Sequence, residues 1–263
     1  MPVNWIDVTN LSFNNLLLLE RVQLSWFPGW LPEKELAIAL QANPVVEWYL
    51  RHKCPEIIPW LDQAFSTHLP HTPQSSEQVR QAELTVHGAI KDLLVYAIDP
   101  SLYDAQSFLG WDSKELTEIA NFHDKVVIDI GSGTGRLAIV AAQTADVVFA
   151  VEPVSNLRRY IKQKAKSQHL TNIFPVDGMI TDLPFPVNFA DITMGGHVFG
   201  DDPDAEYTEM MRVTKAGGMI ILCPGTNMQQ TKAHDYLISQ GFSWSMFEEP
   251  GDGSKRKYWK TLK

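Results

Sequence analysis

The chain has few of the features that mark secreted, membrane or metal-binding proteins. It contains only two cysteines, Cys54 and Cys223, which lie far apart and form no Cys-x-x-Cys pair. This argues against a disulfide framework and a thiolate zinc site, so we expect two reduced thiols and no bound metal. The longest leucine run, Leu16–Leu19, is much too short to span a bilayer. Because residues 1–5 also lack the basic start of a secretory signal, we expect a soluble, cytoplasmic protein without a membrane partner.

The chain also lacks an excess of positive charge. Its 22 Lys and Arg against 31 Asp and Glu give a formal net charge of −9. Since proteins that modify nucleic acids need basic surfaces to meet phosphates, this balance argues against a nucleic-acid partner. The hydrophobic content of 44% is typical of a folded chain, and 263 residues suffice for one large domain or a core with a smaller attachment.

The first hundred residues show helical spacing of apolar positions, interrupted by prolines. The strongest pattern predicts one helix over 75–98, which begins with Ser75 and Gln78 at capping-box spacing and ends before Pro100. Its apolar face has helical spacing and consists of Val79, Ala82, Val86, Ile90, Leu93 and Ala97. We therefore predict an all-helical cap over residues 1–100 and a second domain over 101–263.

From about residue 124, predicted strands and helices alternate. Apolar, β-branched runs predict five strands, over 126–130, 147–151, 173–176, 190–194 and 219–222. Helical patterns separate them, over 137–142, 155–168 and 205–213, which favours a parallel sheet covered by helices on both faces. After a further helix over 232–239, alternating runs at 241–247 and 256–260 flank turn residues and predict an antiparallel hairpin at one edge. The predicted fold class is α/β, with seven strands.

The strand at 126–130 runs directly into the glycine-rich segment Gly131–Gly135. Glycines let backbone approach a ligand where a Cβ would collide, and the following helix offers free N–H groups. The next strand ends at Glu152, whose carboxylate is suited to ribose hydroxyls. We therefore interpret this region as a nucleoside site, with a plain strand–helix turn as the alternative.

The glycine spacing bears on which nucleoside would bind. The segment has the pattern G-x-G-x-G, whereas dinucleotide sites use G-x-G-x-x-G to hold a pyrophosphate. Asp129, just before the glycines, suits a ligand that carries an ammonium or sulfonium group and would sit poorly beside a pyrophosphate. A nicotinamide-dependent oxidoreductase is therefore a distant alternative.

The run Val126–Arg136 closely resembles the first motif of the class I, Rossmann-like S-adenosylmethionine-dependent methyltransferases. The resemblance continues in order through four further segments, Ala150–Pro153, Val176–Met179, Phe189–Ile192 and Arg212–Gly218. It covers about residue 101 to the C-terminus and leaves out the first hundred residues. It implies a Rossmann-like methyltransferase sheet, S-adenosylmethionine as methyl donor and S-adenosylhomocysteine as product.

The resemblance also implies roles for individual residues. Those expected along the methionine moiety are Asp129, Gly131, Ser132, Gly133 and Gly135. Those expected at the ribose and adenine are Glu152, Pro153, Asp177, Gly178 and Met179. Gly195, after the fourth strand, and Tyr103, just before the core, complete the expected cofactor site.

One segment departs from the family pattern. After the fourth strand, some family members carry an Asn/Asp-Pro-Pro-Tyr-type motif that orients an amine, and this chain has Met194-Gly195-Gly196-His197 instead. The departure favours a small-molecule acceptor, methylated at O, N or C. His197 is the candidate general base, because this edge of the fold faces the methyl group; the alternative is that it only lines the pocket. A second hypothesis is a catalytically silent protein that binds S-adenosylmethionine as a sensor or scaffold.

Overall fold

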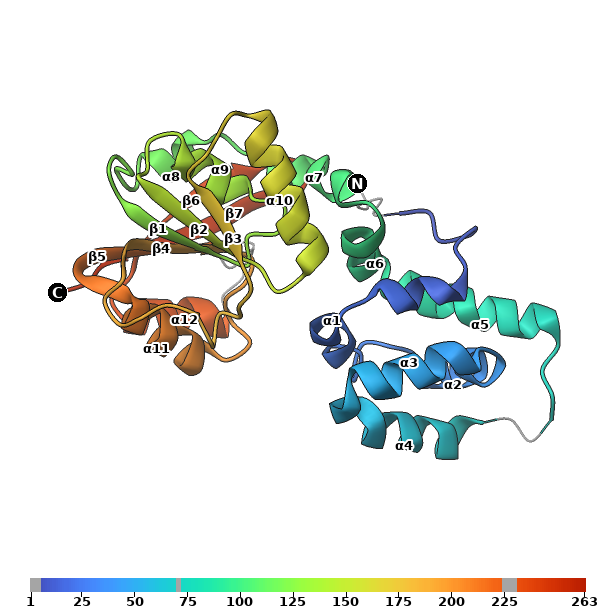
Figure 1. Ribbon diagram of the computed structural model, residues 1–263. Helices are drawn as coiled ribbons and strands as arrows, with labels where there is room; N and C mark the ends of the chain where they lie inside the picture. The colour runs from blue at the N-terminus through green and yellow to red at the C-terminus, as the bar shows by residue number, and fades with distance from the viewer. Residues whose placement is uncertain (1–5, 70–71, 224–230) are drawn as a thin grey trace. The chain divides into compact units, whose positions relative to one another are not determined.

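The computed structural model describes residues 6–69, 72–223 and 231–263. The chain divides into two units, residues 2–103 and 104–263, and each is described by itself. Figure 1 shows that the first consists of helices and the second is built on a sheet. In the described parts of both units, no helix combines the length and apolar character that crossing a bilayer requires.

The helical unit is held together by a leucine-rich core. Leu36, Leu40, Leu61 and Leu94 are fully buried, and α2 packs against both α4 and α5. The helices of this unit are η1 (Phe13–Leu18), α1 (Arg21–Ser25), α2 (Glu33–Ala42), α3 (Pro44–Lys53), η2 (Pro55–Ile57), α4 (Ile58–His68), α5 (Ser76–Ala89) and α6 (Lys91–Ile98), followed by α7 (Pro100–Asp104) at its end.

The predicted single helix over 75–98 is wrong, because the structure has two helices there, α5 and α6. The capping box at its start is confirmed: Gln78 N–H donates to Ser75 Oγ at 3.2 Å, and Ser75 N–H donates to Gln78 Oε1 at 2.8 Å. The break comes at Ile90, which leaves helical dihedral angles (φ −120°, ψ 21°) while its side chain stays fully buried. Gly88 lies in the last turn of α5, where its low helix propensity weakens the continuation.

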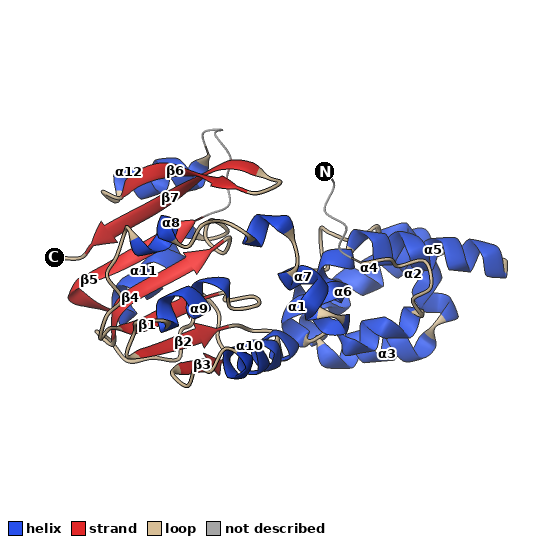
Figure 2. Cartoon of the chain, turned by 90° about the horizontal axis from the view of Figure 1, so that it is seen from above, coloured by secondary structure: helices blue, strands red, loops and turns tan. Residues whose placement is uncertain are grey.

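The second unit contains a seven-stranded sheet with the strand order β3-β2-β1-β4-β5-β7-β6 (Figure 2). The first five strands are parallel, and β7 runs antiparallel to both β5 and β6. The strands are β1 (Val126–Ile130), β2 (Val147–Val151), β3 (Ile173–Val176), β4 (Ala190–Gly196), β5 (Thr214–Cys223), β6 (Ser243–Glu249) and β7 (Gly253–Thr261). The predicted α/β fold with a terminal antiparallel hairpin is confirmed.

Helices cover both faces of this sheet, as Figure 1 shows. Along β1, Val127 packs on the face that carries α9, whereas Ile128 packs on the opposite face, beside α11. This double burial explains why the parallel strands read as continuous apolar runs. The helices of the unit are η3 (Ser107–Leu109), α8 (Lys114–Thr117), α9 (Arg136–Ala142), α10 (Ser155–Ser167), α11 (Pro203–Val213) and α12 (Lys232–Ser239).

The strand register positions the candidate site. Ile130, the last residue of β1, pairs with Val151 of β2 on one side and with Gly195 of β4 on the other. The residues that follow these three strands therefore emerge side by side at the carboxyl edge of the sheet. Open α/β sheets bind their ligands at this edge, where the strand order reverses.

Candidate active site

The glycine-rich loop leaves β1 in a conformation that favours glycine. Gly131, Gly133 and Gly135 have φ angles of +59°, +54° and +82°, in the left-handed region. A Cβ on Gly131 would lie 2.1 Å from Val198 Cγ1, so glycine is needed here for the loop after β4 to pack against it. Ser132 fixes the turn through its hydroxyl, which donates to the Asp129 carbonyl at 2.8 Å.

Glu152 follows β2 and is tied to the loop. Its Oε2 accepts from Gly133 N–H at 2.9 Å, and its Oε1 accepts from Val154 N–H at 2.9 Å. The side chain is 5% exposed, so the carboxylate is fixed within the edge of the sheet. Arg158 of α10 donates to the Glu152 carbonyl at 2.6 Å and holds the same turn.

Asp129 is the most buried acidic group of the site, 1% exposed. Its Oδ2 accepts from Ala138 N–H of α9 at 3.0 Å, while Oδ1 has no hydrogen-bond partner among the described residues. Burial raises the pKa of Asp129 to about 7, and the charge of Glu152 acts in the same direction. Two carboxyl groups beside one loop favour a ligand that carries positive charge.

Thr134 is a candidate that the sequence reasoning did not single out. Its Oγ1 is buried inside the loop and, like Asp129 Oδ1, finds no hydrogen-bond partner in the described part of the chain. A buried polar atom without a partner is costly, which marks both oxygens as positions for a bound ligand or water. The sequence feature that could have indicated Thr134 is its position between Gly133 and Gly135, in a loop whose predicted role rested on its backbone.

The segment expected at the adenine lies beside Glu152. Asp177 follows β3, its side chain is 74% exposed, and it pairs with Arg158 at 3.1 Å. Met179 is partly exposed, and its backbone bridges to Asp182. Arg158 thus links Glu152 and Asp177, while Pro153 and Gly178, adjacent to them in sequence, are partly buried.

Tyr103 belongs to the helical unit, where its ring packs edge-on against Tyr96 with centroids 4.9 Å apart. Its expected role at the cofactor stays a prediction.

Residues 104–111, before α8, are anchored to α9 and α10, the helices that follow the glycine-rich loop and Glu152. Asp104 accepts hydrogen bonds from Tyr160 Oη at 2.9 Å and Lys164 Nζ at 2.6 Å, both on α10. Arg136, the first residue of α9, donates to the Trp111 carbonyl at 2.6 Å, and its guanidinium lies 4.5 Å from the Trp111 ring centroid. These contacts hold the indole of Trp111 above the sheet.

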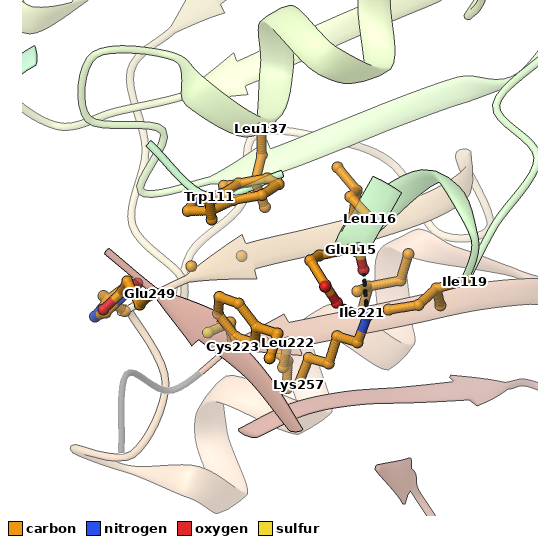
Figure 3. Close-up of a pocket in the computed structure, with 14 residues that line it drawn as sticks. Trp111, Glu115, Leu116, Ile119, Leu137, Ile221, Leu222, Cys223, Glu249 and Lys257 are labelled. Carbon is orange, nitrogen blue, oxygen red and sulfur yellow. Dashed lines mark hydrogen bonds and ion pairs between the residues drawn. The ribbon is translucent and has the colours of Figure 1, made fainter. Parts of the chain in front are cut away.

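An apolar pocket adjoins the ends of β4 and β5 (Figure 3). Lys257 Nζ forms an ion pair with Glu115 Oε2 at 2.5 Å on its wall. Gly195, expected at the cofactor, and His197 both line it. Its apolar lining comes from α8 and the residues next to it, from α9 and from the sheet, and includes Trp111, Leu116, Ile119, Leu137, Ile221, Leu222 and Phe247.

His197 is held by its backbone and its ring. Its φ is +59°, unusual for a residue other than glycine, and its N–H donates to the Cys223 carbonyl at 2.6 Å. Its Nε2 lies 2.9 Å from Oε1 of Glu249, whose side chain is 2% exposed. Phe108, from η3, flanks the imidazole with centroids 6.3 Å apart. Sequence reasoning missed Glu249, because it comes from β6, 52 residues away.

Residues 128–222, which include this edge of the sheet, match a family described as "Methyltransferase domain". These residues carry a methyltransferase domain. This methyltransferase domain was predicted from the motifs along 126–218, and the sheet order and family match confirm it.

Several known proteins are similar to the chain. A demethylmenaquinone methyltransferase of Geobacillus kaustophilus (strain HTA426) is 29% identical over 126 residues, 46% of this chain and 54% of that protein. Protein arginine N-methyltransferase 8-B of Danio rerio is 37% identical over 73 residues, 27% of this chain and 17% of that protein. The chain thus spans about half or less of the length of these relatives. A crystal structure of a SAM-dependent methyltransferase from Aquifex aeolicus covers 63% of this chain and 100% of its own, with 17% identity and a TM-score of 0.49.

The residues at the carboxyl edge fit S-adenosylmethionine. The buried oxygens Asp129 Oδ1 and Thr134 Oγ1 are unpartnered among the described residues, and the acidic surroundings suit a sulfonium and an ammonium group. In the parts of the chain that the structure describes, no group of three or more His, Cys, Asp or Glu side chains is arranged to hold a metal ion.

Proposed function

We propose that this chain transfers a methyl group from S-adenosylmethionine to a small-molecule acceptor and releases S-adenosylhomocysteine. The observation that carries the proposal is the convergence of Glu152, the loop Gly131–Gly135 and His197 on three neighbouring strands, beside an apolar pocket. The cofactor, when bound, supplies an electrophilic methyl group. The protein must then align the acceptor with it, and such positioning contributes about 7–11 kcal/mol in well-oriented systems.

The cofactor side of the proposal assigns roles to residues around the loop. Glu152 would hold the ribose, and Asp177 with Met179 would frame the adenine. Asp129 and Thr134 would lie toward the methionine moiety, where their unpartnered oxygens support the assignment. The buried carboxyl of Asp129 gives this end of the site its preference for a cation.

The acceptor side rests on the pocket and on the sequence after β4. The lining is apolar apart from a few polar groups, which is typical of small-ligand sites. The Gly195-Gly196-His197 segment has no side-chain amide that could orient an amino group of the substrate. We propose the helical residues 1–100 as a further substrate-binding region.

The test is methyl transfer from tritiated S-adenosylmethionine to two fractions of a cell extract, one of low molecular mass and one of protein. We expect label in small molecules, and strongly reduced label with a Glu152→Ala variant. Label in protein alone would contradict the proposed acceptor class. Cofactor binding without transfer to either fraction would instead favour a silent binding protein.

A further inference from the structure

The buried carboxylate of Glu249 sits behind His197 at the pocket wall. Oε1 of Glu249 and Nε2 of His197 are 2.9 Å apart, and the carboxylate is 2% exposed while the imidazole is 43% exposed. A carboxylate can only accept a hydrogen bond, so Nε2 must carry the proton in this contact. The neutral imidazole then has its lone pair on Nδ1, which has no hydrogen-bond partner among the described residues.

A cation lies near the other carboxylate oxygen of Glu249. Lys255 Nζ lies 3.8 Å from Glu249 Oε2, and the Lys255 side chain is itself only 6% exposed. The same ammonium pairs with Asp252 at 2.7 Å, which fixes its position. Oε2 of Glu249 makes no hydrogen bond among the described residues, so the contact of Oε1 with His197 is the one that orients the carboxylate.

The backbone of His197 adopts an unfavourable conformation. A non-glycine residue at φ +59° is strained, and the bond from His197 N–H to the Cys223 carbonyl holds it there at the end of β5. Strain of this kind collects at functional sites, although Asp124, His169 and Asn188 adopt the same conformation elsewhere in the chain. Glu249, Cys223 and Phe108 therefore hold one histidine from three different elements.

We propose that Glu249 is a positioning residue that holds His197 as a general base, and that the acceptor is an apolar molecule methylated at a hydroxyl group. The proposal rests on the proposed function and narrows its substrate class. A neutral amine attacks through its lone pair without first losing a proton, whereas a hydroxyl becomes a good nucleophile only as its proton leaves. The hydroxyl O–H bond breaks with its proton passing to Nδ1. The oxygen forms a bond to the methyl carbon as the C–S bond breaks, and the electron pair of the C–S bond remains on sulfur.

The apolar lining selects the body of this acceptor. Trp111, Leu137 and Phe247 present rings and aliphatic surface beside His197, and Figure 3 shows Trp111 and Leu137 on the side opposite Cys223 and Leu222. Walls of this apolar character suit the body of an aromatic or aliphatic alcohol whose hydroxyl faces the histidine. The wall of the same pocket also carries the ion pair of Lys257 and Glu115.

The first arm of the test measures the His197 tautomer by ¹⁵N NMR of histidine-labelled full-length protein at pH 8, without cofactor. We expect the Nε2–H form in the wild type, a mixture of both tautomers in Glu249→Gln, and the wild-type form in Glu249→Asp. Glu248→Gln is the matched control, since it is the neighbouring residue on β6, is exposed, and bonds Ser254 instead. An unchanged tautomer in Glu249→Gln would overturn the proposal.

The second arm uses two acceptor probes of the same shape, 4-ethylphenol and 4-ethylaniline, with S-adenosylmethionine. We expect transfer to the phenol, and a kcat lowered about 10²–10⁴-fold in His197→Ala and Glu249→Gln, with KM nearly unchanged. Equal activity of both variants and wild type, or transfer to the aniline alone, would overturn the proposal. A failure of the proposed function would be distinguishable from this. In that case calorimetry would detect no binding of S-adenosylmethionine, while the His197 tautomers of wild type and variants would still be as expected.

Discussion

Oε2 of Glu152 accepts a hydrogen bond from Gly133 N–H at 2.9 Å, which joins the end of β2 to the glycine-rich loop after β1. The carboxylate expected at the ribose and the backbone expected at the methionine moiety therefore form one connected unit. A change at either residue should disturb the position of the other.

Gly131→Ala should destabilise the sheet unit more than Gly217→Ala. Both glycines have positive φ, +59° and +76°, so each variant loses about 1 kcal/mol for the backbone conformation. Only at Gly131 does the new Cβ overlap a neighbour, Val198, whereas nothing lies within 4 Å at Gly217. We expect about 1–3 kcal/mol of additional loss at Gly131, measured by urea unfolding. Equal losses would show that the loop after β4 does not depend on this glycine.

Asp129 should make cofactor affinity depend on pH. Its pKa is raised to about 7 by burial, from an ordinary 3.8, so the folded protein holds a proton there below neutrality. A cationic ligand favours the ionised carboxylate, and we therefore expect S-adenosylmethionine to bind more tightly as pH rises from 6 to 8, with proton release. Calorimetry in two buffers of different ionisation enthalpy counts these protons at pH 7.

Asp129→Asn is the control for this pH dependence. The amide cannot ionise, so affinity should be lower than wild type at pH 8 and nearly flat across the same range. A wild-type slope that persists in the variant would assign the titration to another group.

His87 should make the helical unit less stable in acid. Its ring is fully buried, and neither nitrogen has a hydrogen-bond partner among the described residues. Burial lowers its pKa to about 4, with Arg80 acting in the same direction. Between pH 6.5 and 4 the unfolded chain takes up a proton that the folded chain does not, so the free energy of unfolding falls as pH falls, by about 3 kcal/mol at most. In His87→Leu, the free energy of unfolding should fall less between pH 7.5 and pH 4.5 than it does in the wild type, as measured by urea unfolding at both pH values. An equal fall in the variant and the wild type would contradict the assignment to His87.

Local patterns predicted much of the fold. β1, β2 and β3 lie at their predicted residues, because each is a short apolar run closed by turn residues. The prediction of one helix over 75–98 was wrong at Ile90. The apolar positions keep their helical spacing across this break, because α5 and α6 bury the same side. Periodicity reports which face is buried and does not report whether the backbone is continuous.

The candidate site was predictable only where it is local in sequence. Asp129, the glycines and Glu152 lie within one β-α-β segment, so their proximity follows from the topology. Glu249 reaches His197 from β6, and no spacing rule connects them. The role of Thr134 depends on a side chain that the fold buries without a partner among the described residues.

The most direct test of the account is calorimetric titration of the purified chain with S-adenosylmethionine, S-adenosylhomocysteine and NAD, in the wild type, Glu152→Ala and an exposed control, Glu118→Ala. We predict that both adenosyl ligands bind to the wild type and the control, and bind about 10–100-fold more weakly to Glu152→Ala, the loss expected for hydrogen bonds to a charged group. Binding of NAD alone, or adenosyl binding that Glu152→Ala leaves unchanged, would contradict the proposed cofactor site.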